Sequence, residues 1–139
     1  MARAARTSRV RQRSPGRSGV AVKRVYEPAR RTDGARFLVE RLWPRGVSKA
    51  SVRIDGWLKE AGPSTELRKW FGHDPDRWDS FRKRYWRELD AHPEAWQPIV
   101  SAVRRGPVTL IYSSHDETHN NAVALQEYLG TRVRTRTRR

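Results

Sequence analysis

The strongest constraint on the fold is the segment Val108–Tyr112 (VTLIY), a short and mostly apolar run with turn residues on both sides. Such a run is typical of a strand that is buried on both faces of a sheet. A long region of helical periodicity comes before it, and a strand-like segment comes before that region. Because a parallel neighbour is reached through a long crossover, we expect this strand to pair in parallel with the earlier one.

Two further strands are predicted near the start of the chain. Residues Val20–Tyr26 (VAVKRVY) alternate between apolar and polar side chains, and Arg36–Trp43 (RFLVERLW) is rich in apolar residues. A loop separates them, and Pro44-Arg45-Gly46 ends the second strand. Residues 47–63 are expected to be mostly irregular, with a short helical turn at Trp57–Leu58.

Four helices are predicted from apolar residues at three- and four-residue spacing. The first begins after Ser64 and ends at Gly72, the second begins at Pro75, the third lies between Pro93 and Gly106, and the last covers Thr118–Leu129 and ends at Gly130. The expected fold class is therefore α/β. We expect a small, mainly parallel sheet covered by helices, with a tendency toward a Rossmann-like three-layer arrangement.

The predicted helices also divide the tryptophans. Trp70, Trp78 and Trp96 fall on apolar stripes, so we expect them in the core. Trp86 lies off its stripe and beside arginines, which favours an exposed ring. The helix that holds it also carries Arg82, Lys83, Arg84 and Arg87. Exposed aromatic rings among arginines can stack on nucleic acid bases, but such a basic helix is more often a solvated face.

The charge of the chain is strongly positive, with 30 Lys and Arg against 15 Asp and Glu and a net charge of +15. Residues 1–19 hold six arginines and residues 131–139 hold five, and neither segment contains an acid. Large apolar side chains are scarce in both segments. We therefore expect two disordered, arginine-rich tails around a single domain at residues 20–130.

Several roles remain open for the tails. Arginine-rich segments contact nucleic acid phosphates in a salt-sensitive way, but solvated extensions fit the composition too, and native translation could begin near Val20. No run of 18 apolar residues occurs, which excludes a membrane span, and the first segment lacks the apolar centre of a secretory signal. The absence of cysteine excludes disulfides and thiolate sites, and it fits a cytoplasmic location.

Two segments are expected beyond the carboxyl ends of the strands, where open α/β sheets bind ligands. In Arg41–Gly46, two guanidiniums beside a rigid proline and a permissive glycine suit a phosphate or a carboxylate. Arg41 could equally pair with a core carboxylate. In Tyr112–Asp116, a turn from strand to helix offers backbone N–H groups to an anion, although Asp116 could simply cap the helix. Together the two segments predict an anion pocket.

Other chemistries have weaker patterns in this chain. His115 and His119 are four residues apart, but the order His-Asp-Glu-Thr-His differs from that of zinc proteases. Ser113 and Ser114 lack the Gly-x-Ser-x-Gly elbow of hydrolases. No Walker A motif and no Gly-x-Gly-x-x-Gly motif occurs. We therefore expect neither a metal nor a cofactor.

Several sequence blocks occur together: Val22–Tyr26, Asp33-Gly34-x-Arg36, Glu40–Gly46 (ERLWPRG), Ala61–Ser64 (AGPS), Leu67–His73 (LRKWFGH), Phe81 with Tyr85, Thr109-Leu110-x-Tyr112, and Asn120-Asn121-Ala122. Over residues 22–129 they resemble the family called domain of unknown function 488, in its YeaO-like branch. The resemblance implies a compact bacterial α/β domain with no settled activity and usually without long basic tails. The chain departs from the family pattern in two places: Glu40 stands where Asp is typical, and the pair Ser114-His115 replaces Ala-Lys.

The family pattern concentrates on polar or rigid residues, namely Asp33, Arg41, Pro44, Arg45, Ser64, Arg68, Tyr112 and Asn120. With Gly46 and Ser113 they form the expected ligand site, in which Arg41 and Arg45 bind an anion and Tyr112 and Asn120 orient it. Glu40 or Asp116 is the expected base if its carboxylate lies within reach of the substrate. The expected function is an enzyme or a binding protein for an anionic small molecule. A nucleic-acid-associated protein and a structural or partner-binding domain are the alternatives, and the oligomeric state stays open.

Overall fold

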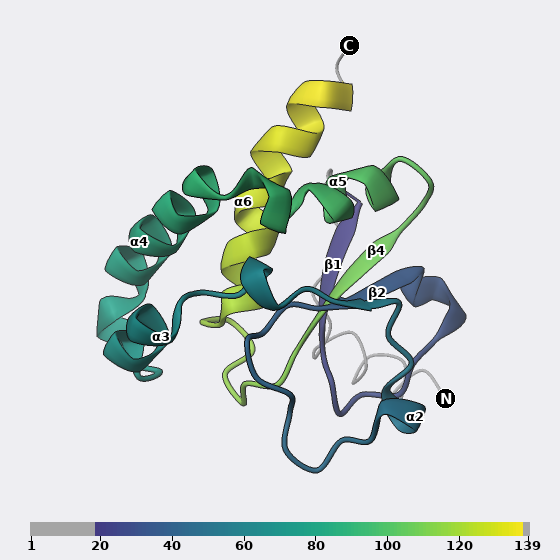
Figure 1. Ribbon diagram of the computed structural model, residues 1–139, viewed down its shortest axis with the longest axis horizontal. Coiled ribbons are helices and arrows are strands. Elements are labelled where there is room, and N and C mark those ends of the chain that lie inside the picture. Colours follow the sequence, from purple (N-terminus) through teal and green to yellow (C-terminus); the bar gives the residue numbers. More distant parts are fainter. Residues whose placement is uncertain (1–18, 138–139) are drawn as a thin grey trace, which may run out of the picture.

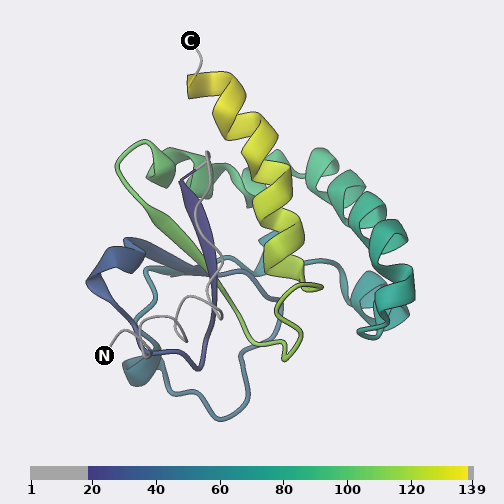
Figure 2. The same ribbon diagram turned by 180° about the vertical axis from the view of Figure 1, so that it is seen from behind.

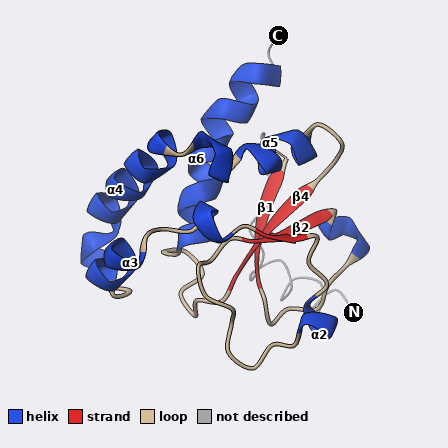
Figure 3. Ribbon diagram, in the orientation of Figure 1, coloured by secondary structure: helices blue, strands red, loops and turns tan. Residues whose placement is uncertain are grey.

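A four-stranded, all-parallel sheet forms the centre of the domain (Figure 3). The computed structural model describes residues 19–137, with side chains described as far as Arg132. The strands are β1 (Val20–Arg24), β2 (Ala35–Leu38), β3 (Gly56–Trp57) and β4 (Val108–Tyr112), in the spatial order β1-β4-β2-β3. The predicted α/β class and the parallel pairing of β2 with β4 are confirmed. Of the tails predicted to be disordered at 1–19 and 131–139, residues 1–18 and 138–139 lie outside the described residues, whereas residues 131–137 continue the last helix.

Strand β2 is shorter than predicted, because it ends at Leu38 rather than at Trp43. Beyond Leu38, side chains take over the bonding of the backbone carbonyls. The amide of Asn121 donates to the Val39 carbonyl at 2.6 Å, and the indole of Trp57 in β3 donates to the Glu40 carbonyl at 2.7 Å. The chain therefore leaves the ladder and turns along the carboxyl edge of the sheet.

The helices are α2 (Lys49–Val52), α3 (Thr65–Phe71), α4 (Trp78–Ala91), α5 (Gln97–Val103) and α6 (Asn121–Thr137) (Figure 1). Four short 3-10 turns join them to the other elements, namely η2 (Arg31–Asp33), η3 (Lys59–Ala61), η4 (Pro75–Arg77) and η5 (Pro93–Ala95). Strand β3 was not predicted, since two residues show no periodicity; the short helical turn expected at Trp57–Leu58 was wrong, because Trp57 pairs with Leu38 of β2. No helix in the described part of the chain is long and apolar enough to cross a membrane.

Both faces of the sheet are covered, which explains why every residue of β4 is buried. The face that bears Val22 and Leu110 packs against α4, α5 and α6. The other face bears Leu38 and Ile111 and is covered by α2 and the loops around it. Helix α6 lies directly on the sheet, while α4 lies outside it with α3 alongside (Figure 2).

The tryptophans follow the prediction except at one position. Trp96 is buried, and Trp70 and Trp78 are partly buried against the core. Trp86 was expected to be exposed, but its ring is also partly buried, and its indole N–H donates to the Ala124 carbonyl of α6 at 2.9 Å. The prediction was wrong because α6 packs against a second face of α4, and no local pattern reveals that neighbour.

The C-terminal end of α6 also differs from its prediction. The helix continues through Gly130 to Thr137, so the expected end at Gly130 was wrong. In the next turn, Arg132 donates to Asp90 of α4 at 2.8 Å, and its guanidinium lies 3.7 Å from the centre of the Tyr128 ring. Glycine inside a helix costs about 1 kcal/mol, and these contacts with the body of the domain offset that cost.

A buried cluster of charges lies on the second face of the sheet. The carboxylate of Asp33 accepts hydrogen bonds from Lys23 of β1 at 3.1 Å and from Arg36 of β2 at 2.6 Å. All three residues are at most 4% exposed. Arg36 also donates to the carbonyls of Val52 and Arg53, each at 2.8 Å. One carboxylate therefore connects two strands with the loop that covers them.

We predict that Asp33→Asn lowers the free energy of unfolding by about 3–5 kcal/mol at pH 7, because two buried cations lose their anion. Burial opposes the ionisation of Asp33, but hydrogen bonds from the Arg30 backbone, Lys23 and Arg36 outweigh it and hold its pKa below the ordinary value. The wild type should therefore lose this stabilisation as the pH falls through that lowered pKa, and the variant should not.

Urea denaturation at pH 7 and at pH 3 measures both effects. Glu94→Gln is the control, because Glu94 is an exposed acid. Equal loss of stability in the two variants at pH 7 would contradict the assigned role of Asp33.

Candidate functional site

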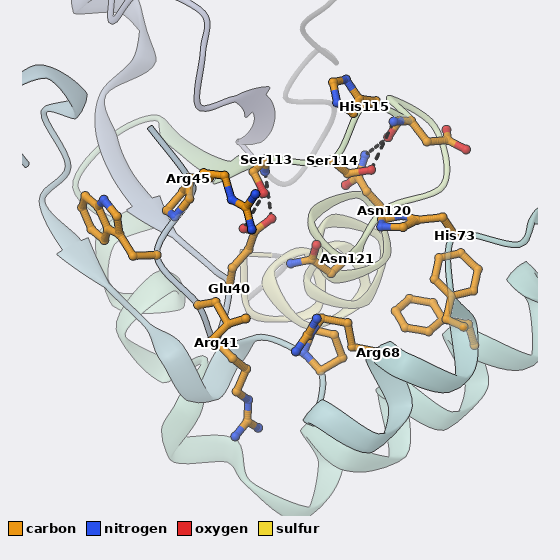
Figure 4. A pocket seen from close by; sticks show the side chains of 17 residues that line it. Glu40, Arg41, Arg45, Arg68, His73, Ser113, Ser114, His115, Asn120 and Asn121 are labelled. Carbon is orange, nitrogen blue, oxygen red and sulfur yellow. Dashed lines mark hydrogen bonds between the residues drawn. The ribbon is translucent and has the colours of Figure 1, made fainter. Parts of the chain in front are cut away.

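The carboxyl ends of β2 and β4 open into a pocket of about 630 Å³ beside the N-terminus of α6 (Figure 4). The segments that follow the two strands form one part of its wall, and α3, α4 and the first residues of α6 form the rest. The lining residues are Glu40, Arg41, Leu42, Trp43, Pro44, Arg45, Pro63, Arg68, Phe71, His73, Phe81, Ser113, Ser114, His115, Asp116, Asn120 and Asn121. The structure thus brings the two predicted ligand segments together.

Glu40 and Ser113 connect the two strand ends across the pocket edge. The backbone N–H of Ser113 donates to one carboxylate oxygen of Glu40 at 2.8 Å, and its hydroxyl donates to the other oxygen, also at 2.8 Å. Arg24 of β1 holds the same loop by donating to the Ser114 carbonyl at 2.8 Å. Both oxygens of Glu40 are therefore occupied, and this edge of the pocket is held by three strands.

The pKa of Glu40 is shifted by its burial at the edge of the pocket. Burial raises the pKa of Glu40, and the hydrogen bonds from Ser113 together with the positive charges of Arg68 and His73 only partly offset that effect. The net pKa lies above the ordinary value for glutamate. Burial thus makes Glu40 a weaker acid than an exposed glutamate.

Three arginines line the pocket, but they do not face it alike. Arg41 donates from Nε to the Gly62 carbonyl at 3.3 Å, and its guanidinium points away from the other labelled side chains (Figure 4). Arg45 and Arg68 come from opposite sides, one from the loop after β2 and the other from α3. Among the described residues, neither side chain has an acidic partner within ion-pair distance.

The turn before α6 uses its polar side chains for capping. Asp116 accepts hydrogen bonds from the backbone N–H groups of Thr118 and His119 at 3.0 and 2.9 Å. Burial alone would raise the pKa of Asp116, but these hydrogen bonds and those from the two side chains outweigh it and lower the pKa. Asn120 accepts from the Val123 N–H at 2.9 Å, so α6 begins after Asn120 rather than at Thr118.

Four of the expected ligand residues do not line the pocket. Asp33 lies in the buried charge cluster, and Gly46 lies outside the wall. Ser64 caps α3 by accepting from the Leu67 N–H at 3.1 Å, and its hydroxyl donates to Glu88 at 2.6 Å.

Tyr112 belongs to the core under α6, where burial raises its pKa to about 12. The structure therefore gives Asp33, Ser64 and Tyr112 structural positions. Pro44, Arg45, Arg68, Ser113 and Asn120 do line the pocket, as do Glu40 and Asp116.

Sequence reasoning missed the far wall of the pocket, which is made by Phe71, His73 and Phe81. The two phenylalanines stack with ring centres 4.3 Å apart, and their helical spacing marks them only as core residues. His73 has a positive φ of 60°, directly after the left-handed C-cap at Gly72. The turn at Gly72 was predicted, but its position beside the sheet edge depends on how α3 packs.

No group of three His, Cys, Asp or Glu side chains in residues 19–132 could hold a metal ion.

We predict that Glu40→Gln changes how stability depends on pH. Because the pKa of Glu40 is raised in the folded state, the folded protein binds the proton more tightly than the unfolded chain does. The wild type should therefore lose stability as the pH rises from the ordinary glutamate pKa through the raised value, by about 1.4 kcal/mol for each tenfold change in the ionisation constant.

Glutamine does not titrate, so the stability of the variant relative to wild type should improve across that range. Thermal unfolding measured from pH 4 to pH 8 tests this, with the exposed Glu94→Gln as control. Parallel curves for wild type and Glu40→Gln would contradict the pKa assignment.

Comparison with known proteins places the chain in a family. The family model described as "Inactive DUF488-N3 subclade" matches residues 19–139. The uncharacterized protein YeaO of Escherichia coli is 42% identical over 110 residues, which cover 79% of this chain and 96% of that protein. The uncharacterized protein Rv3073c of Mycobacterium tuberculosis is 37% identical over 113 residues, covering 81% of this chain and 95% of that protein. No solved structure matches the chain. The family match and the identity to YeaO confirm the predicted resemblance. The chain belongs to the DUF488 family, with YeaO-like relatives.

Proposed function

We propose that this protein binds an anionic small molecule, bearing a phosphate or a carboxylate, in the pocket at the carboxyl edge of the sheet. The observation that carries the proposal is the pair Arg45 and Arg68, which line the cavity from opposite sides without an acidic partner among the described residues. A guanidinium presents a planar fork of donors that matches phosphate and carboxylate oxygens. Two such forks around one cavity favour an anion between them.

The remaining wall supports binding of a whole small molecule rather than a bare ion. A volume of about 630 Å³ lies within the 300–1,000 Å³ typical of small-molecule sites. Trp43, Phe71 and Phe81 supply apolar surface, and Asn121 at the start of α6 supplies an amide and the positive end of the helix. The site therefore combines apolar contact with a few polar groups that would fix the orientation of a ligand.

The carboxylates favour binding over catalysis. Both oxygens of Glu40 accept hydrogen bonds from Ser113, and the carboxylate of Asp116 is held by the turn that begins α6. A general base needs an oxygen that can reach the substrate proton. The matching family model is described as an inactive subclade, which agrees with a site that holds a ligand without converting it.

We predict that phosphate or citrate raises the melting temperature of the wild type and that Arg45→Ala with Arg68→Ala abolishes the rise. At ten times its Kd, a bound anion stabilises the folded state by about 1.4 kcal/mol. For a domain of this size, that corresponds to about 4 °C in Tm. Thermal unfolding at constant ionic strength, with chloride as the reference anion, measures the shift.

Arg104→Ala with Arg105→Ala is the matched control, because it also removes two exposed positive charges but lies at the far end of α5. If this control loses the shift equally, the anion acts on overall charge and the pocket proposal fails. If wild type shows no shift with either anion above the chloride reference, the proposal fails as well.

A further inference from the structure

The outer face of α4 carries a row of positive side chains that no other element covers. Lys83, Arg84 and Arg87, here called the basic stripe, are exposed, and their helical spacing places them on one side of α4. Ser80 and Ala91 extend that side at its two ends and are also exposed. Helix α4 lies at the outside of the molecule in both views (Figures 1 and 2).

The acids of α4 are engaged elsewhere. Asp79 pairs with Arg82 at 2.6 Å, and Asp90 pairs with Arg132 of α6 at 2.8 Å. Glu88 accepts from the backbone N–H of Ser64 at 2.9 Å. Within the described part of the chain, no carboxylate lies within ion-pair distance of the basic stripe. The charge of the stripe is therefore not neutralised by the helix that bears it.

Arg84 is positioned by an aromatic ring. Its guanidinium lies 4.2 Å from the centre of the Trp70 ring of α3, which Arg77 also approaches at 5.1 Å. A contact with the face of an aromatic ring restrains a guanidinium while its in-plane N–H donors stay available. Lys69, the residue before Trp70 on α3, is also exposed. The surface thus holds one oriented guanidinium, that of Arg84, among other exposed cations.

We propose that the basic stripe, together with Trp70 and Lys69, binds the phosphate backbone of nucleic acid without reading its sequence. Neighbouring side chains three or four residues apart on a helix lie about 5–6 Å apart, which suits contacts with successive phosphates of a strand. The net charge of +15 adds a long-range attraction to any polyanion. This site is separate from the pocket, since none of its residues lines that cavity.

The composition of the stripe favours nucleic acid over a membrane or a protein. A helix that binds a lipid surface needs exposed large apolar residues to insert, whereas the apolar side chains Phe81, Tyr85 and Leu89 of α4 are buried in the core. Protein interfaces depend on a central apolar or aromatic anchor, whereas the uncharged exposed residues of α4 are Ser80 and Ala91, which lie at the two ends of the stripe. A phosphate backbone needs only the cations.

The test compares two triple variants of the full chain. The variant K83A/R84A/R87A removes the basic stripe, and K49A/R104A/R105A removes three exposed cations from α2 and from the end of α5. Fluorescence anisotropy with a short labelled DNA duplex, between about 50 and 200 mM NaCl, gives the slope of log K against log salt for each protein. Equal melting temperatures ensure that both variants are folded.

The expected result is a slope whose magnitude falls by about 2–3 in the stripe variant and by less than about 1 in the control, because each lost phosphate contact removes about 0.9. Equal slopes in the two variants would overturn the proposal and assign binding to overall charge. Retained binding to the duplex, with lost binding to phosphatidylserine vesicles, would also overturn it and indicate a lipid surface.

Discussion

The buried carboxylate of Asp33 is the interaction on which the second face of the sheet depends. It neutralises Lys23 and Arg36, two cations that the strand periodicity turns toward the interior. Charges in such a setting are tolerated only when they are paired and hydrogen-bonded, since their desolvation is costly. Through Arg36, the same group fixes the carbonyls of Val52 and Arg53 in the covering loop. That loop connects the pocket segment after β2 with β3.

A second carboxylate organises the edge of the sheet that forms the pocket. Glu40 after β2 and Ser113 after β4 bring two strand ends together, and Arg24 adds the end of β1 to the same loop. The pocket is therefore built where neighbouring parallel strands finish side by side. Asn121 adds the start of α6 by bonding the carbonyl of Val39. The proposed ligand site is therefore largely preformed, which would limit the ordering cost of binding.

The two proposed anion sites differ in how they hold their cations. In the pocket, Arg45 and Arg68 line a concave and partly apolar space, which suits a compact ligand that fills it. On α4 the cations lie in a row along a convex helix, where each can reach a separate charge of an extended polyanion. In the pocket, Glu40 accepts hydrogen bonds from Ser113, and Asp116 accepts them from the turn before α6. On α4, Asp79 pairs with Arg82 and Asp90 pairs with Arg132 of α6.

The sequence by itself determined the fold class, the three longer strands and most helix positions, because hydrophobic periodicity is a local property of the chain. It also identified the segments Arg41–Gly46 and Tyr112–Asp116, whose placement follows from the rule that parallel strands end at one edge. Only the tertiary structure decided the roles of individual polar residues. Arg41 turns away and Arg68 faces the pocket.

Contacts formed only in the folded protein also explain why the end of α6, the burial of Trp86 and the position of Asp33 differ from their predictions. The end of α6 depends on Arg132 meeting Asp90, and the burial of Trp86 depends on α6 packing beside α4. Asp33 serves the core rather than the pocket because Lys23 reaches it from a neighbouring part of the sheet. The partners in these contacts lie 42, 38 and 10 residues apart in the chain, and a local pattern holds no information about which of these residues will become neighbours. Tertiary packing supplies that neighbour, and with it the chemistry of the site.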